Sequence, residues 1–296
     1  MQVDATKEPQ ASPQAERKAA AEGQYYTRIE PINGWRLPNF LELWRFRELI
    51  YCLAWRDLKV RYKQTVLGIA WAVLQPLLMM IVFTIIFGRM AKLSSGDLPY
   101  PLFALAGLLP WFFFSTAVTN CANSVIASER LVTKIYFPRL AIPLAALGAA
   151  AVDSLVALGL LAVLMAYYQV APGIGLLLLP VVYATVCLAA LGVGTGLAAL
   201  TVTYRDFRYV TPFFMQLWMF ATPTVYMATS ATTSEGHASL WLLNPMTGLI
   251  AAFRAVCLGG EIPWLQFAVA AQFAVLLVFA GAFYFRRVED RFADII

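Results

Sequence analysis

Residues 56–80 read RDLKVRYKQTVLGIAWAVLQPLLMM and join a charged segment to an apolar one without a linker. The first eight residues carry five charged side chains and a tyrosine, and the rest are almost all apolar. Gln75 and Pro76 place an amide and a proline inside the apolar part. This pattern is typical of a chain that passes from a membrane surface into the bilayer, with a helix kink expected at Pro76.

The composition indicates an integral membrane protein. Of 296 residues, 60% are hydrophobic and 13% are charged, whereas a soluble domain carries about 25% charged residues. The apolar runs are long enough to cross a bilayer. We therefore expect an all-α integral membrane fold with six transmembrane helices, at residues 66–87, 102–127, 140–168, 175–202, 210–227 and 265–285.

An N-terminal amphipathic interface helix is predicted before the first span. Residues 40–63 place a polar side chain every three or four positions, which suits a helix lying in the headgroup region. The predicted apolar face consists of Phe46, Leu49, Ile50, Leu53 and Val60.

Re-entrant half-helices are predicted between the fifth and sixth spans. Asn244 and Pro245 form a helix start, and Gly259 a helix stop. The helix between them would be roughly 21 Å long, too short to cross a hydrocarbon core of about 30 Å.

The chain is expected to divide into four segments. These are a disordered cytoplasmic tail at 1–34, the interface helix at 35–63, the transmembrane domain at 64–287 and a cytoplasmic tail at 288–296. The transmembrane domain includes a charged loop at 128–139 and an external region at 228–263. Lys and Arg gather at one end of the spans, so the positive-inside rule places both termini in the cytoplasm.

The sequence contains no motif for redox cysteines, metal binding, nucleic acid binding or ATP hydrolysis. The four cysteines form no CxxC pair, His237 has no partner at metal-ligand spacing, and no basic-aromatic repeat suggests nucleic acid binding. The glycine cluster GVGTG at 192–196 lacks the lysine of a P-loop and suits close helix packing. We expect no enzyme activity, metal or cofactor in this chain, and any energy source must lie in another subunit.

Two features leave alternatives open. Asp153, the one clear ionisable residue in a span, is either a relay or a carboxyl paired with a neighbouring hydroxyl or amide. The loop SERLVTKIYFPR at 128–139 mixes charges with apolar residues. It either docks into a groove on a soluble partner or dips its apolar residues into lipid.

Six blocks of sequence, in order, resemble a known family. They are WRDLKVRYKQTVLGIAWAVLQPLLMM, LPYPLFALAGLLPWFFFSTA, KIYFPRLAIPL, YRDFRYVTPFFMQLWMFATPTVYM, LNPMTGLIAAFR and EDRFADII. The family is the permease subunit of ABC transporters that export polysaccharides, and RYKQTVLGIAWAVLQP with FADII is most like O-antigen exporters. Capsule and teichoic acid exporters are related.

The resemblance implies a partner set and a substrate. It implies a homodimer with two ABC nucleotide-binding subunits that bind ATP and Mg²⁺, in the bacterial inner membrane. The substrate would be a polysaccharide on undecaprenyl pyrophosphate or a similar lipid. It further implies that a coupling helix contacts the ATPase through Glu129, Arg130, Leu131, Val132, Thr133, Lys134, Ile135 and Tyr136.

Candidate substrate residues follow from chemistry that suits such a molecule. A headgroup-sensing set of cations would bind the pyrophosphate, although the same residues suit topology and anionic lipid: Arg56, Lys59, Arg61 and Lys63. Gln75 and several aromatic residues would line a glycan pathway, although interfacial aromatic belts are the alternative: Trp111, Phe112, Phe114, Phe214, Trp218, Phe220 and Tyr226. The external half-helix would form a gate with Asn244, Pro245 and Arg254.

Two other functions remain as alternatives. One is an ion-coupled lipid or glycolipid flippase, which the scarcity of charge in the spans disfavours. The other is a non-catalytic membrane scaffold of a glycan synthase.

Overall fold

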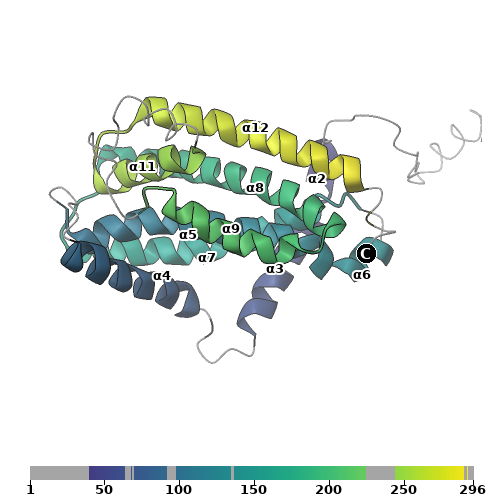
Figure 1. Cartoon of the computed structure of the whole chain (residues 1–296), viewed down its shortest axis with the longest axis horizontal. Coiled ribbons are helices and arrows are strands. Elements are labelled where there is room, and N and C mark those ends of the chain that lie inside the picture. Colours follow the sequence, from purple (N-terminus) through teal and green to yellow (C-terminus); the bar gives the residue numbers. More distant parts are fainter. Residues whose placement is uncertain are drawn as a thin grey trace, which may run out of the picture. The chain divides into compact units, whose positions relative to one another are not determined.

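The computed structural model describes residues 40–63, 68, 70–91, 98–134, 137–224, 244–289 and 292, and within these ranges it contains helices and no strands. Figure 1 shows their arrangement. The helices are α2 (Phe40–Arg45), α3 (Arg47–Tyr62), α4 (Ala70–Phe83), the π-helix η1 (Thr84–Met90), α5 (Tyr100–Ala127), α6 (Glu129–Lys134), α7 (Ala141–Tyr167), the 3₁₀ helix η2 (Ile174–Leu178), α8 (Leu179–Thr203), α9 (Phe207–Phe220), α11 (Pro245–Leu258) and α12 (Trp264–Glu289).

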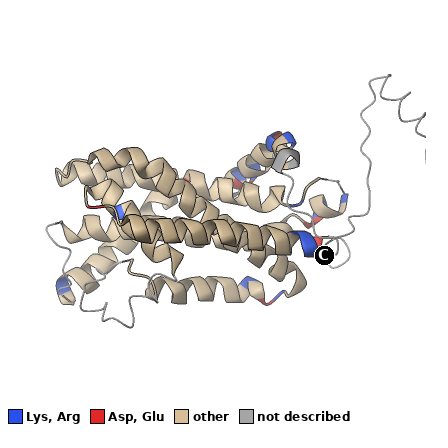
Figure 2. Ribbon diagram, turned by 90° about the horizontal axis from the view of Figure 1, so that it is seen from above, with Lys and Arg blue, Asp and Glu red and all other residues tan. Residues whose placement is uncertain are grey.

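Five of the expected spans form helices long and apolar enough to cross a membrane. They are Ala70–Met90, Tyr100–Ala127, Ala141–Tyr167, Ile174–Thr203 and Trp264–Glu289. The first continues through Pro76 and then widens into η1. Most of the Lys and Arg residues of the described chain lie toward one end of these helices (Figure 2).

The fifth expected span differs from the prediction. Its described part, α9, has 14 residues and ends at Phe220, and residues 221–224 form a turn. Two causes act at this end. Pro223 disfavours helical geometry at the residue before it, and Arg254 binds the main-chain carbonyls of Pro223 and Thr224. Residues 225–243, with the candidate Tyr226, lie outside the described residues.

Helix α5 is the most buried of the spans and packs against α7 and α8, while α12 packs along α8 (Figure 1). Small residues make the α8–α12 contact possible. A Cβ on Gly192 would lie 2.5 Å from the backbone of Leu277, and one on Gly281 would lie 2.2 Å from the carbonyl oxygen of Gly192. The glycines of the GVGTG cluster therefore include one that serves close helix packing, as expected.

The predicted interface helix is two helices rather than one. Phe46 separates α2 from α3. Phe46, Leu49 and Ile50 pack against a core cluster that includes Leu140 and Phe285. Val60 is 72% exposed, and its place on a lipid-facing apolar side stays a prediction. The next residue, Arg61, contacts Asp153 of α7.

The α8–α12 contact generates a prediction about stability. Gly192→Val places a branched side chain against the backbone of α12, and overpacking of this kind costs about 1–3 kcal/mol. We expect a lower thermal midpoint and less monodisperse protein in detergent. Gly159→Val in α7 is the matched control, because a Cβ there meets nothing within 4 Å. Equal stability of the two variants would contradict the close contact.

Candidate functional site

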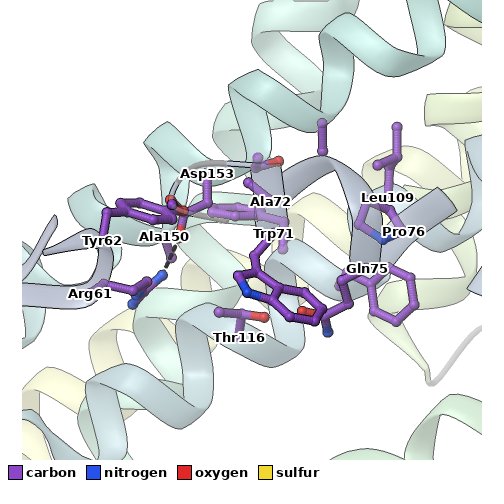
Figure 3. A pocket seen from close by; sticks show the side chains of 15 residues that line it. Arg61, Tyr62, Trp71, Ala72, Gln75, Pro76, Leu109, Thr116, Ala150 and Asp153 are labelled. Atoms are coloured by element: carbon purple, nitrogen blue, oxygen red, sulfur yellow. Dashed lines mark hydrogen bonds and ion pairs between the residues drawn. The ribbon is translucent and has the colours of Figure 1, made fainter. Parts of the chain in front are cut away.

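A cavity of about 280 Å³ lies among α3, α4, α5 and α7 (Figure 3). Its lining is mixed. Arg61, Tyr62 and Asp153 form a polar group, and the other residues that carry functional groups are Trp71, Gln75, Thr116 and Ser154. Apolar side chains such as Leu109 and Phe112 complete the wall. The cavity therefore gathers three of the residues singled out in the sequence, Arg61, Gln75 and Phe112, together with Asp153.

The polar group is an ion pair with a hydroxyl. The guanidinium of Arg61 donates to one carboxylate oxygen of Asp153, and the hydroxyl of Tyr62 donates to the other. The Arg61 side chain is 33% exposed and that of Asp153 is 18% exposed. Burial, followed by the hydrogen bond to Asp153 and its charge, raises the pKa of Tyr62 to about 12, so this hydroxyl remains a donor at neutral pH.

Asp153 thus has the paired role expected as one of its two alternatives, but its partners differ in part from the prediction. A hydroxyl partner was expected, whereas the charged partner, Arg61, comes from a helix outside the spans. A carboxylate within an apolar bundle needs such a partner, since an isolated charge there is costly. The pair therefore fixes α3 against α7.

The other three cations of the headgroup-sensing set lie along α3 and just beyond it, outside the cavity lining. Arg56 bonds to Asp57 at 2.8 Å and donates to the Ser128 hydroxyl at 3.3 Å. Lys59 lies 5.7 Å from the centre of the Trp55 ring. Lys63 is exposed. These three side chains are exposed cations on α3 and just beyond it, whereas Arg61 contacts α7.

Two of the pathway aromatics are core residues of the chain. Trp111 is 2% exposed and Phe114 is 0% exposed, and both contact the ring of Trp218, at centroid distances of 6.1 and 5.3 Å. Their predicted place on a pathway surface is therefore corrected to the packing of α5 against α9. Phe214 and Phe220 are exposed on α9, at 51% and 60%.

The segment expected to couple to an ATPase contains the short helix α6. Its polar residues Glu129, Arg130, Thr133 and Lys134 are exposed. Val132 is buried and Leu131 is partly buried, both against a cluster that includes Phe285 and Phe292. The apolar side chains thus pack inward, so the surface available for docking on α6 is polar. Ile135 and Tyr136 lie outside the described residues.

Phe292, near the C-terminus, also packs in this cluster. Phe292 is fully buried, its ring centroid lies 5.2 Å from that of Phe285, and the guanidinium of Arg139 lies 5.9 Å from its centre. The segment expected to be a tail therefore carries a core residue.

The predicted gate half-helix, α11, forms with the expected boundaries. The side chain of Asn244 accepts from the backbone N–H of Met246, and Gly259 ends the helix with a φ of 81°. Asn244 also accepts from the indole of Trp218 at 3.1 Å and donates to Thr222 at 2.9 Å. Arg254 lies 3.9 Å from the centre of the Phe103 ring.

Residues that the sequence analysis missed are Tyr62, Trp71 and Thr116. Trp71 precedes Gln75 by four positions, which places both on one face of a helix. That spacing could have identified Trp71 once Gln75 was chosen. Nothing in the sequence pairs Tyr62 or Thr116 with a residue so far along the chain.

A helical bundle with five candidate spans, a mixed cavity beside a surface helix and an exposed polar helix beyond α5 is the architecture of a multi-pass membrane protein. The chain belongs to the ABC-2 type transporter family, whose membrane-component model matches residues 48–258. The family expected from the sequence is thereby confirmed.

The chain is also similar to curated permeases. It is 30% identical over 256 residues to the O-antigen export system permease protein RfbA of Myxococcus xanthus, covering 86% of this chain and 98% of that protein. It is 26% identical to the protein of the same name from Klebsiella pneumoniae, covering 84% and 95%. It is 22% identical to the polysialic acid transport protein KpsM of Escherichia coli, covering 79% and 91%.

The ion pair generates a prediction in the form of a double-mutant cycle. Asp153→Asn leaves the Arg61 guanidinium without its carboxylate and should lower the thermal midpoint. Removing one member of a fully buried pair costs about 3–5 kcal/mol, and we expect less here because Arg61 is one-third exposed. Arg61→Gln combined with Asp153→Asn should recover most of the loss. Thermal unfolding of both single variants and the double variant in one detergent measures the coupling, and strictly additive losses would contradict it.

Proposed function

We propose that the chain is the membrane subunit of an ATP-driven exporter, and that it moves a lipid-linked polysaccharide of O-antigen type out of the cytoplasm. Family membership and the names of the curated relatives support the transport class and the substrate. The observation that carries the proposal on this chain is the Arg61 guanidinium at a cavity beside the spans. Arginine suits a pyrophosphate, because it offers charge and paired N–H donors.

The substrate would approach along α3. Arg56, Lys59 and Lys63 would attract the headgroup, since each exposed cation near an anionic surface contributes about 1 kcal/mol. The pyrophosphate would then compete with Asp153 for Arg61. The carrier lipid in this proposal is undecaprenyl pyrophosphate or a comparable anchor.

The energy would come from two ABC nucleotide-binding subunits beneath a dimer of this chain in the bacterial inner membrane, with both termini in the cytoplasm. The exposed polar residues of α6 would contact the ATPase. Arg56 donates to Ser128, which directly precedes α6, so α3 contacts both the coupling region and the cavity. Movement of α6 could reach the cavity through this helix. Helix α11, with Asn244, Pro245 and Arg254, would form part of the external gate.

The ion-coupled flippase has less support. Its coupling ion would need Asp153, and that carboxylate is already occupied by Arg61 and Tyr62. No described feature favours the scaffold over an exporter.

The test is co-purification with the candidate ATPase partner. Wild-type chain in lipid nanodiscs should hydrolyse ATP only with the partner present. Arg130→Glu with Lys134→Glu should reduce partner recovery and ATP turnover at least about tenfold, because two charges on the docking surface are reversed. Arg89→Glu, an exposed charge reversal at the far end of the first span, is the control. Full ATP turnover by the α6 variant would show that α6 does not couple to the ATPase. ATP hydrolysis by the chain alone would overturn the proposal that the partner subunit hydrolyses ATP.

A further inference from the structure

The cavity holds more than a site for an anion. Beyond Arg61, it presents an indole, an amide, a hydroxyl and a carboxylate on one small surface, from Trp71, Gln75, Thr116 and Asp153. We propose that it binds the sugar ring next to the anionic group of the substrate, with Trp71 as the stacking surface and the three polar side chains as hydrogen-bonding groups. This inference rests on the proposed function and gives its substrate a carbohydrate subsite.

The aromatic surface is accessible. Trp71 is 49% exposed although it is a large apolar residue at the start of the first span, and it lines the cavity. Figure 3 shows its ring between the Arg61–Asp153 pair and Gln75. A flat aromatic face binds the apolar face of a ring without selecting one orientation of its hydroxyls. This property suits a sugar that must later leave the site.

The polar groups supply both kinds of hydrogen bond. Gln75 offers an acceptor and two N–H donors, and Thr116 offers a hydroxyl that both donates and accepts. Each oxygen of Asp153 receives one donor from the protein, and a carboxylate oxygen can accept more than one. Gln75 and Thr116 are exposed within the described chain, so ligand hydroxyls can reach them.

The order of groups along the cavity matches a sugar phosphate. Arg61 and Asp153 lie at one side in Figure 3, and Gln75 at the other, with Trp71 and Thr116 between them. An anionic group at Arg61 would thus place the attached ring over Trp71. The arrangement also gives Gln75, a polar residue in an apolar span, a direct contact with the substrate.

An acyl chain is a poorer occupant. A second cavity, of about 420 Å³, is lined mainly by apolar side chains such as Leu144, Leu191 and Val278, although Trp44, Arg47 and Thr195 also line it. In the smaller cavity, the exposed amide of Gln75 and the hydroxyl of Thr116 would lose hydrogen bonds to water and gain none from an acyl chain, which is unfavourable. Binding sites for small polar ligands combine apolar walls with a few convergent polar groups in this way.

The test compares carrier lipids with and without a sugar. Full-length chain in nanodiscs is titrated with undecaprenyl diphosphate and with its glucose, galactose and N-acetylglucosamine derivatives. At least one sugar-bearing lipid should bind about tenfold or more tightly than the bare diphosphate, an interval that corresponds to about 1.4 kcal/mol. Trp71→Ala and Gln75→Leu should each remove most of this difference, measured for each variant as the ratio of its affinities for the sugar-bearing and the bare lipid. Trp264→Ala, at another exposed tryptophan, should keep it.

The outcomes separate the two proposals. If the bare diphosphate binds and no sugar improves it, the subsite is overturned and the anion site stands. If sugar improves binding but Trp71→Ala and Gln75→Leu behave as wild type, this cavity is not the subsite. If none of the four lipids binds, both the subsite and the proposed headgroup recognition fail.

Discussion

The ion pair between Arg61 and Asp153 is the constraint on which the membrane-surface half of the structure depends. A carboxylate in α7 is stable in an apolar bundle only with a cation and hydrogen-bond donors, and α3 provides both from consecutive residues. The hydrogen bonds from Arg61 and Tyr62 to the Asp153 carboxylate therefore fix the position and rotation of α3.

Polar contacts set the geometry elsewhere in the bundle as well. Asn244 caps α11 and joins it to Trp218 and Thr222, while Arg254 binds the carbonyls of the turn after α9. Lipid gives helices little hydrophobic reason to associate, so close packing and hydrogen bonds decide their arrangement. These contacts hold α11 against the turn at residues 221–224. If α11 acts as a gate, the turn must move with it.

Sequence reasoning located the helices because their length and hydropathy follow directly from the bilayer. The ends of α11 could also be predicted from the sequence, since Asn, Pro and Gly act through local backbone geometry. The end of α9 could not be predicted in this way, because it depends on Arg254, which lies 30 residues after Thr224, whose carbonyl it binds. The same holds for Asp153, whose partner lies 92 residues earlier. Trp111 and Phe114 show a related limit, since residue type alone does not distinguish a core aromatic from one on a surface.

The central claim is that Arg61 serves the substrate as well as the fold, and export by one variant tests it most directly. Arg61→Gln with Asp153→Asn keeps the summed charge of the pair at zero and removes the guanidinium from the cavity. Surface polysaccharide is measured in cells that carry this variant as the sole copy, at matched levels of membrane-inserted protein that co-purifies with its ATPase. The account predicts that export falls at least about tenfold. Export at the wild-type level by such a correctly assembled variant would contradict it and leave the pair a purely structural contact.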